Sequence, residues 1–588
     1  MGKPVLSIRD LNVDLFRDRI AHRILHDISF DMAPGEVVAL VGESGSGKST
    51  IGLAIQGLLN ALATPSISGS IKLAGQEVVD APERSLRSLR RDRVRAISQD
   101  ALSSLNPTMT IGSQMAEGAN ASRDTMRDWL ERTGLPDPDR ILGSYPHRLS
   151  GGQRQRVMIA MAMLADPALL IADEPTTALD VTVQAQILRL LRSLSHEGTA
   201  ILFVTHDLGV ASTLADRVLV CYRGRIVERG ATPDVLHEPA HPYTRDLMSA
   251  RFHLASDRTR PLPAGAVARD VPEVGLCPYL GRCGLAISVC HEEPPPKLAG
   301  AGPNHLALCH RAGIDAAAAD APADPWPEFE HEDEIALEIQ GVTKSFPAGP
   351  RNWFGRRAPK KVLRGVDLTI LRGECVALVG ESGSGKSTIL RIAAGLETAD
   401  HGEVRLPDGA RPQVIFQDAF SSLTPWMRIG AQIAERLPAQ LGRHERRDRV
   451  AEAMSGLGLD PALAEALPSD LSGGQCQRAV VARAMINLPR LLLCDEPISA
   501  MDVSLAAQTL NLFNEIRRKK GIAMLFITHD LAAARLIADR IAVLEQGRLV
   551  EAGPAEEVIS APRHPYTRSL IAAIPRMGAR NVSERAAP

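Results

Sequence analysis

Residues 38–51 read VALVGESGSGKSTI, and the same letters return without a change at residues 376–389. The apolar run before each first glycine is typical of a buried parallel strand, and a helical pattern follows each G-K-S. The pattern G-x-x-x-x-G-K-S between a strand and a helix predicts a phosphate-binding loop, because its glycines let backbone N–H groups converge on phosphate at a helix N-terminus. The chain therefore carries two predicted nucleotide sites.

Each loop offers the same predicted contacts. Lysine adds a point charge for the β- and γ-phosphates, and the serine after it offers a hydroxyl to Mg²⁺. The predicted ATP contacts are Gly42, Ser44, Gly45, Gly47, Lys48, Ser49 and Thr50 in the first loop and Gly380, Ser382, Gly383, Gly385, Lys386, Ser387 and Thr388 in the second.

Two further blocks are duplicated. LSGGQRQR at 149–156 returns as LSGGQCQR at 471–478, and LLIADEP at 169–175 returns as LLLCDEP at 491–497. The order of the blocks is the same in both halves, which indicates gene duplication and one structural unit written twice.

Composition limits the class of protein. A chain of 588 residues is too long for one core, and 45% hydrophobic with 23% charged residues is typical of globular domains. A net charge of −2 gives no electrostatic footprint for nucleic acid. The longest apolar stretch, 157–165, is shorter than the roughly 20 residues that span a bilayer, and the first residues lack the apolar region of a secretory signal. We therefore expect a cytoplasmic protein whose eight cysteines are thiols or metal ligands.

The duplicated acidic pairs follow short apolar runs of strand type. Strand ends of this kind form the ligand-binding edge of an α/β sheet. Asp173 and Asp495 suit Mg²⁺, whereas Glu174 and Glu496 are candidates to orient and deprotonate the attacking water. The alternative is a pair of helix-capping residues followed by proline.

The order of these elements, with Thr-His-Asp downstream, resembles the ATP-binding-cassette (ABC) ATPases over almost the whole chain. The resemblance implies an α/β fold of two P-loop NTPase cassettes. Each cassette would have a RecA-like α/β core, an antiparallel β subdomain and an α-helical subdomain, and a small cysteine-rich extension would follow the first.

The resemblance also implies a head-to-tail cassette pseudo-dimer, in which each ATP lies between one half's loop and the other half's LSGGQ. Ser150 and Gly152 would serve the ATP on Lys386, and Ser472 and Gly474 the ATP on Lys48. The other implied roles are Mg²⁺ and water sensing by Gln99 and Gln417, γ-phosphate contact by His206 and His529, communication between sites by Asp180 and Asp502, and adenine stacking by Phe16 and Phe346. Both halves retain every catalytic residue type, so both sites are expected to hydrolyse ATP.

Residues 98–117 and 417–435, together with HPYTRDL at 241–247 and HPYTRSL at 564–570, resemble the ATPases of oligopeptide, dipeptide and nickel importers. This implies a peripheral subunit at the cytoplasmic face of a bacterial inner membrane, with two permease subunits and an extracytoplasmic solute-binding protein as partners. Di- and oligopeptides are the expected cargo, with glutathione, nickel or another small solute as alternatives. A soluble twin cassette acting on ribosomes or DNA is a rival class, which the near-neutral charge and the acidic linker disfavour, and an exporter ATPase is another.

Cys277, Cys283, Cys290 and Cys309 are closely spaced after the first cassette. Their spacing permits a Cys₄ zinc site, an iron–sulfur cluster or plain thiols, and the resemblance to peptide importers implies [4Fe–4S]. His291, His305 and His310 flank the thiols and could substitute as ligands.

The expected domains are a first cassette at 1–255, the extension at 256–310, an Ala-, Pro- and acid-rich linker at 311–334, a second cassette at 335–576 and a disordered end at 577–588.

Overall fold

The computed structural model describes residues 3–17, 20–59, 65–98, 104–119, 121–176, 181–250, 252, 254, 275–302, 304–312, 332–351, 357–407, 411–498, 501 and 503–574. Gln99, Asp180 and Asp502 lie outside the described residues, as do most of the predicted linker and the whole of 577–588. The predicted domain limits therefore stay predictions.

Each half is built on a mostly parallel sheet, as the buried apolar runs predict. In the described residues the first sheet has eight strands in the order β11-β12-β10-β9-β3-β8-β7-β6, and the second has six in the order β17-β18-β19-β15-β20-β21. The first-half strands are β3 (Val37–Val41), β6 (Val94–Ile97), β7 (Leu169–Asp173), β8 (Ala200–Thr205), β9 (Arg217–Tyr222), β10 (Arg225–Ala231), β11 (Ala299–Gly302) and β12 (His305–Ala307). The second-half strands are β15 (Cys375–Val379), β17 (Gln413–Ile415), β18 (Leu491–Asp495), β19 (Ala523–Ile527), β20 (Arg540–Glu545) and β21 (Arg548–Pro554).

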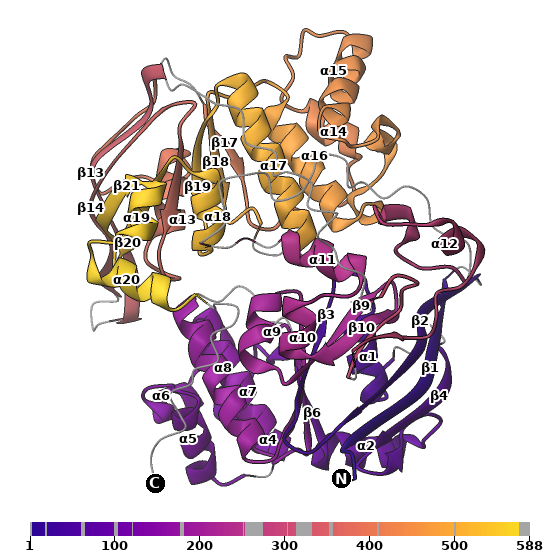
Figure 1. The fold of residues 1–588 in the computed structure, drawn as a ribbon. Coiled ribbons are helices and arrows are strands. Elements are labelled where there is room, and N and C mark those ends of the chain that lie inside the picture. Colours follow the sequence, from indigo (N-terminus) through magenta and orange to yellow (C-terminus); the bar gives the residue numbers. More distant parts are fainter. Residues whose placement is uncertain are drawn as a thin grey trace.

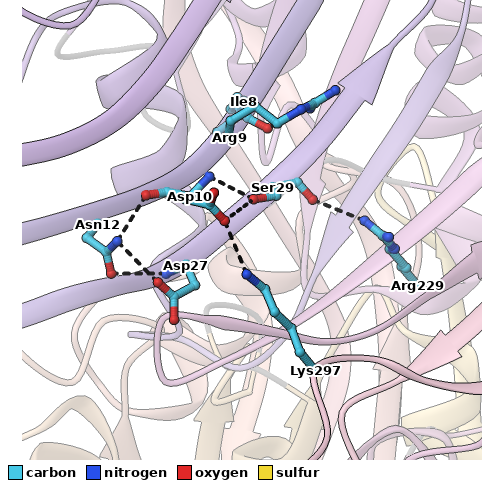
Figure 2. Close-up of polar contacts among 8 residues, drawn as sticks. All are labelled: Ile8, Arg9, Asp10, Asn12, Asp27, Ser29, Arg229 and Lys297. Carbon is cyan, nitrogen blue, oxygen red and sulfur yellow. Dashed lines mark hydrogen bonds and ion pairs between the residues drawn. The ribbon is translucent and has the colours of Figure 1, made fainter.

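A separate antiparallel sheet covers one side of each half (Figure 1). The first is formed by β1 (Leu6–Arg17), β2 (Ile20–Met32), β4 (Ser66–Leu73) and β5 (Gln76–Glu77), and the second by β13 (Glu332–Arg351), β14 (Arg357–Arg372) and β16 (His401–Arg405). Figure 2 shows how the first is fastened: Arg229 of β10 donates to the Ser29 carbonyl at 3.1 Å, and Lys297 of the cysteine-rich segment bonds Asp10 at 3.2 Å.

Helices cover the other sides, and Figure 1 places α4 to α8 opposite β1 and β2. The first-half helices are α1 (Lys48–Ile55), α2 (Glu83–Asp92), α4 (Ile111–Ala119), α5 (Arg123–Arg132), α6 (Pro138–Leu142), η2 (Pro146–Arg148), α7 (Gly151–Met163), α8 (Val181–His196), α9 (Leu208–Leu214), α10 (Thr232–His237), α11 (Pro242–Ser249), η3 (Leu280–Arg282) and α12 (Ser288–Glu292). The second-half helices are α13 (Lys386–Ala393), α14 (Ile429–Ala434), α15 (Arg443–Ser455), η6 (Pro461–Glu465), η7 (Pro468–Asp470), α16 (Gly473–Met485), α17 (Val503–Lys520), α18 (Leu531–Ile537), α19 (Ala555–Ser560) and α20 (Pro565–Ala572).

The central strand of each half is buried on both faces. In β3, Val38 and Leu40 enter a core shared with the antiparallel sheet. Ala39 and Val41 instead pack with residues of α9, α10 and α11. Because successive side chains of a strand point to opposite faces, β3 is fixed between two cores and its carboxyl end is held in place.

The cysteine-rich segment joins the first sheet directly. Its strand β12 pairs antiparallel with β10, matching Ala307 with Glu228, and β11 pairs with β12 at the sheet edge. We call residues 275–312 the cysteine extension. It therefore continues the main sheet of the first half.

The halves touch through the chain that leaves α11. Ala250 packs against Ala507 of α17, together with Phe252 and Val503. The Arg535 guanidinium donates to the Leu254 carbonyl.

Among the described helices, none is long and apolar enough to cross a membrane.

Candidate nucleotide sites and the cysteine cavity

Both phosphate-binding loops lie at the carboxyl end of a central strand, between β3 and α1 and between β15 and α13. Gly42 and Gly380 have the same φ of 152°. A Cβ at Gly42 would lie 2.1 Å from the Cys221 carbonyl oxygen, and one at Gly380 would lie 2.2 Å from that of Leu544. Only glycine therefore fits where each loop leaves its strand.

The loop lysines are buried and held alike. Lys48 Nζ donates to the carbonyls of Gly42 at 2.7 Å and Glu43 at 2.8 Å. Lys386 Nζ donates to those of Gly380 at 2.7 Å and Glu381 at 2.9 Å. Each ammonium is thus fixed inside its loop, where an anionic phosphate gains most from it because the surroundings are partly desolvated.

The remaining loop residues follow the predicted order. Gly45 and Gly383 have positive φ, and a Cβ at either position would meet nothing within 4 Å, so the space beside them is open. Gly47 and Gly385 are the left-handed N-caps of α1 and α13. The other predicted contacts, placed in the loops or the first helical turns, are Ser44, Thr50, Ser382 and Thr388.

A serine and an aspartate meet beside each loop. Ser387 Oγ donates to Asp495 Oδ1 at 3.1 Å, and Ser49 hydrogen-bonds Asp173 in the same way. Burial raises the pKa of both aspartates, and the serine bond opposes the rise. A hydroxyl and one carboxylate fit Mg²⁺, which keeps several waters and takes its other oxygens from phosphates.

The neighbouring glutamates form a second pair of matched contacts. His206 Nδ1 lies 3.0 Å from Glu174 Oε1, and His529 Nδ1 lies 3.3 Å from Glu496 Oε2. Both glutamates have φ of 47°. A left-handed backbone at a non-glycine residue is strained, and such strain gathers at functional sites. Strain repeated in both copies argues against the interpretation as an ordinary capping pair.

The two histidines have raised pKa values. Burial lowers the pKa of His206 and of His529, but the bond and the charge of the adjacent glutamate outweigh it, so both pKa values are raised. For Glu496 the directions are reversed: burial raises the pKa of its carboxyl group, but the bond to His529 and the charge of His529 outweigh burial, so the pKa is lowered. Gln417 Nε2 donates to Glu496 Oε2 at 3.3 Å, which places this predicted water-sensing residue at the carboxylate.

The LSGGQ serines begin helices. Ser150 caps α7 by accepting from the Gln153 amide, and Ser472 caps α16 by accepting from the Gln475 amide. Each helix has 13 residues, so its N-terminus attracts anions. The two glycines of the predicted contact set, both in the first helical turn, are Gly152 and Gly474.

The predicted adenine-stacking rings are accessible. Phe16 in β1 is 43% exposed and Phe346 in β13 is 36% exposed. The Lys344 ammonium lies 5.3 Å from the centre of the Phe346 ring. Large aromatic rings left open to water suit stacking on a ligand, and their role stays a prediction.

Sequence reasoning missed two contacts to the loops. The Tyr243 hydroxyl accepts from the Glu43 amide at 2.8 Å, and the Tyr566 hydroxyl accepts from the Glu381 amide at 2.9 Å. Burial lowers the pKa of His241 to about 4, so its neutral Nδ1 accepts from the Tyr243 amide at 3.1 Å. The signal was the repeated His-Pro-Tyr-Thr itself, whose physical purpose is to brace each loop.

The four cysteines of the extension line one cavity. Cys277, Cys283, Cys290 and Cys309 share it with His241, Tyr279 and His310. Burial raises the pKa of Cys277 to about 11, and the three other thiols add to the rise. Of the flanking histidines proposed as substitute ligands, His305 instead bonds Glu228 at 2.5 Å. The other four cysteines are buried free thiols: Cys221, Cys375, Cys476 and Cys494.

Two family models match the sequence. The ABC transporter model matches residues 25–177 and 363–499, and the model of the oligopeptide/dipeptide transporter C-terminal region matches residues 227–290 and 550–587. Three relatives span 97% of this chain. They are the peptidoglycan transport ATP-binding protein YejF of Agrobacterium fabrum (38% identity, 96% of the relative), the oligopeptide transport ATP-binding protein OppD of Mycobacterium tuberculosis (37%, 98%) and the glutathione import ATP-binding protein GsiA of Escherichia coli (37%, 89%).

The chain belongs to the ABC transporter family. Its described fold also matches the structure of RNase-L Inhibitor, with a TM-score of 0.55 over 92% of this chain and 90% of the other, and at 18% identity this likeness shows the fold alone. The prediction of two ABC cassettes is confirmed. The matched segments include both phosphate-binding loops, both LSGGQ blocks and both Asp-Glu pairs, so this ABC protein is an ATP-binding transport ATPase.

The iron–sulfur prediction has no such support. In the described part of this ABC protein, no group of three or more His, Cys, Asp or Glu side chains is arranged to hold a metal ion. The four thiols nevertheless line one cavity. Four cysteines are therefore suitable ligands for a cysteine-ligated metal group, but in the structure their side chains are not arranged around a common metal position.

Proposed function

We propose that this ABC protein is the ATP-hydrolysing subunit of a bacterial importer of di- and oligopeptides. It would lie at the cytoplasmic face of the inner membrane and work with two permease subunits and an extracytoplasmic solute-binding protein. The observation that carries the proposal is similarity over 97% of the chain to ATP-binding proteins named for oligopeptide, peptidoglycan and glutathione transport. The oligopeptide/dipeptide C-terminal region, matched in both halves, supports it.

In the proposed reaction each half binds ATP and Mg²⁺ on its own loop. Asp173 and Ser49 in the first site, and Asp495 and Ser387 in the second, would hold the cation together with the phosphates, because each aspartate lies within hydrogen-bonding distance of its serine. Glu174 and Glu496 orient the attacking water and take its proton. In-line phosphoryl transfer needs positioning and charge stabilisation most, and the strained backbone that both glutamates share supports a functional role for them.

His206 and His529 complete the two sites. Their raised pKa values favour the imidazolium form, which suits a contact with the γ-phosphate. Gln417 reports on Mg²⁺ and water in the second site, and Gln99 is assigned the same role in the first.

The two ATP molecules are proposed to lie between the halves, each sandwiched by the loop of one and the LSGGQ of the other. Figure 1 supports a head-to-tail pairing, because the antiparallel sheets of the two halves lie at opposite ends of the molecule. Asp180 and Asp502 would pass the state of one site to the other. Preferential binding of ATP to the closed pair supplies the energy of the cycle, which the permease subunits receive.

Glutathione is the second candidate cargo. Similarity to the glutathione import protein of Escherichia coli, at 37% identity, favours it over nickel and other small solutes. A soluble twin cassette acting on ribosomes or DNA receives no support from the relatives above.

Uptake measured in cells tests the proposal. Labelled dipeptides, oligopeptides and glutathione are supplied to cells that carry the protein and its permease, with wild type compared with Glu174→Gln plus Glu496→Gln. We expect peptide uptake in the wild type and none in the double variant. Uptake of glutathione alone would correct the cargo. Unchanged uptake in the double variant, with the protein absent from membranes, would refute the importer function.

The four-thiol cavity is proposed to hold a [4Fe–4S] cluster, with Zn²⁺ as the alternative. Thiolates are ligands of both groups, and the four thiols line one cavity, so the residue types present fit either group. When bound, the group would cross-link the extension. Anaerobic purification followed by iron, sulfide and zinc analysis tests this, with Cys290→Ser as the control.

A further inference from the structure

The cysteine extension reaches the first phosphate-binding loop. Arg282, at the end of η3 and directly before Cys283, donates from Nη1 to both carboxylate oxygens of Glu43, at 2.9 and 3.1 Å. Each side chain is only 16% exposed. Glu43 is the second residue of the loop, so a residue 239 positions away holds the nucleotide-binding backbone through a mostly buried ion pair.

Aromatic packing keeps Arg282 in place. Its guanidinium lies 5.5 Å from the centre of the Tyr279 ring. Tyr279 packs edge-on against Tyr222 at 5.2 Å and lies 5.4 Å from Tyr243. Because Tyr243 accepts from the Glu43 amide, the extension and α11 grip the side chain and the backbone of one loop residue together.

The same residue touches the catalytic lysine. The Glu43 carbonyl accepts from Lys48 Nζ at 2.8 Å, so a shift of Glu43 moves the ammonium that awaits the phosphates. The Glu43 carboxylate is also a negative charge close to where a polyanion must bind. Arg282 compensates that charge, and a partly buried carboxylate that lost its partner would repel the phosphates.

The described residues of the second half include no four-cysteine segment beside the loop. Its backbone bond is kept, from the Glu381 amide to Tyr566. However, Glu545 stands where the first half has Tyr222, and the sequence contains no second four-cysteine segment. Arg282 itself therefore contacts the first loop and belongs to no duplicated block of the sequence.

We propose that Arg282 is a positioning residue for the first ATP site, so that its loss weakens nucleotide binding at that site and leaves the second site unchanged. It acts through Glu43, by neutralising its charge and fixing the loop that carries Lys48. The proposal rests on the proposed ATPase function but not on which solute is carried.

Site-resolved ATP binding tests the proposal. The purified full-length protein is titrated with a photoreactive azido-ATP, and labelled peptides are assigned by mass spectrometry to the first or second half. Arg282→Ala is expected to weaken labelling of the first half roughly fivefold to tenfold, within the usual range of coupling between sites, and to leave the second half unchanged. Arg282→Ala with Glu43→Gln is expected to restore the first half, because the unpaired charge is gone.

Lys297→Ala is the matched control. Lys297 makes the other ion pair of the extension, to Asp10 at 3.2 Å, and is 71% exposed (Figure 2). Its loss should change neither affinity. Unchanged first-half labelling in Arg282→Ala, an equal fall in both halves, or no restoration by Glu43→Gln would each overturn the proposal. Absence of labelling in the wild type would instead refute the ATPase function, so the two failures are distinguishable.

Discussion

The two nucleotide sites are nearly identical at their centres and different at their edges. Lys48 and Lys386 make the same pair of carbonyl contacts to within about 0.1 Å, and Glu174 and Glu496 share one strained φ of 47°. Outside the loops, only the first half has the cysteine extension on its sheet. Duplication has therefore kept what phosphoryl transfer needs and changed what surrounds it.

Substitution of glutamine for each of the proposed catalytic glutamates gives the sharpest test of whether the centres of the two sites are equal. Glu174→Gln and Glu496→Gln keep the shape of the side chain but cannot take a proton from water. If each site hydrolyses its own ATP, we expect each single variant to lose turnover at its own site on the order of 1000-fold, the usual contribution of a general base. Single-turnover hydrolysis with site-resolved labelling measures this.

Each single variant, Glu174→Gln or Glu496→Gln, serves as the matched control for the other. Equal losses in the two single variants would confirm that both sites are competent. Full activity in one single variant would show that its site does not contribute, and the two centres would then be unequal in spite of their matched geometry.

Alanine at the strand-to-loop glycines tests the second shared feature. Gly42→Ala and Gly380→Ala force a Cβ to within 2.1 and 2.2 Å of a carbonyl oxygen at a φ that alanine avoids. We expect each to lower the free energy of unfolding of its own half by about 3 kcal/mol. Calorimetric melting would measure the loss.

Gly45→Ala serves as the control for strain without a clash. It has positive φ but open space around a Cβ, so its cost should be nearer 1 kcal/mol. If Gly42→Ala were as mild as Gly45→Ala, the close approach of Gly42 to β9 would not be what fixes the loop.

The centres of the sites could be predicted from the sequence because their chemistry is local. Glycine spacing, the lysine after it and an acidic pair after an apolar run each specify a short segment, and the alternation of apolar residues specifies a buried strand beneath it. Two copies in one order then predicted two cassettes, which the family match confirmed.

The edges could not be predicted because their contacts join distant segments. Tyr243 braces Glu43 from 200 residues away and Arg282 from 239. No local pattern gives such a pairing, since it depends on how β9, α11 and the extension pack. The strained backbone of Glu174 also has no local signal, because the Glu174 amide donates to the Val204 carbonyl of the neighbouring strand β8 at 2.9 Å.

An exposed tryptophan tests a smaller difference, in the segment that follows Gln417, the proposed water-sensing residue. Trp426 is 82% exposed, close in sequence to the exposed Phe420, whereas Thr108 occupies the equivalent place in the first half. A ring so open to water is expected to anchor a partner. We expect Trp426→Ala to lower uptake about tenfold and leave ATP hydrolysis by the isolated protein unchanged.

Thr108→Ala is its counterpart and should lower uptake less than twofold. Equal effects of the two substitutions would mean that both halves meet their permease subunits in the same way. Loss of ATP hydrolysis in Trp426→Ala would mean that the ring supports the fold instead.

The smallest expected effect is a pH dependence confined to the first half. His305 of β12 bonds the buried Glu228, and this bond, with help from Asp234 and Glu238, raises the pKa of His305 above 6.5 despite its burial. Because the pKa of His305 is raised, its ion pair with Glu228 contributes fully to the free energy of unfolding below pH 6.5. This contribution is lost as the pH rises through the raised pKa. The extension should therefore become less tightly held in alkaline solution.

The second half supplies the comparison. Glu551 occupies the place of Glu228 and accepts from the amides of Arg563 and His564, as Glu228 does from those of Ala240 and His241. Burial raises the pKa of Glu551, but its hydrogen bonds outweigh burial and lower the pKa below 4.5. The stability that the ionised Glu551 carboxylate contributes is therefore lost only in acid, as the pH falls through this lowered pKa. Above pH 6.5 we therefore expect the melting temperature of the first half to fall by about 2 °C while that of the second stays constant. His305→Gln keeps a hydrogen bond without the charge and should abolish the slope; an unchanged slope in that variant would place the titrating group elsewhere.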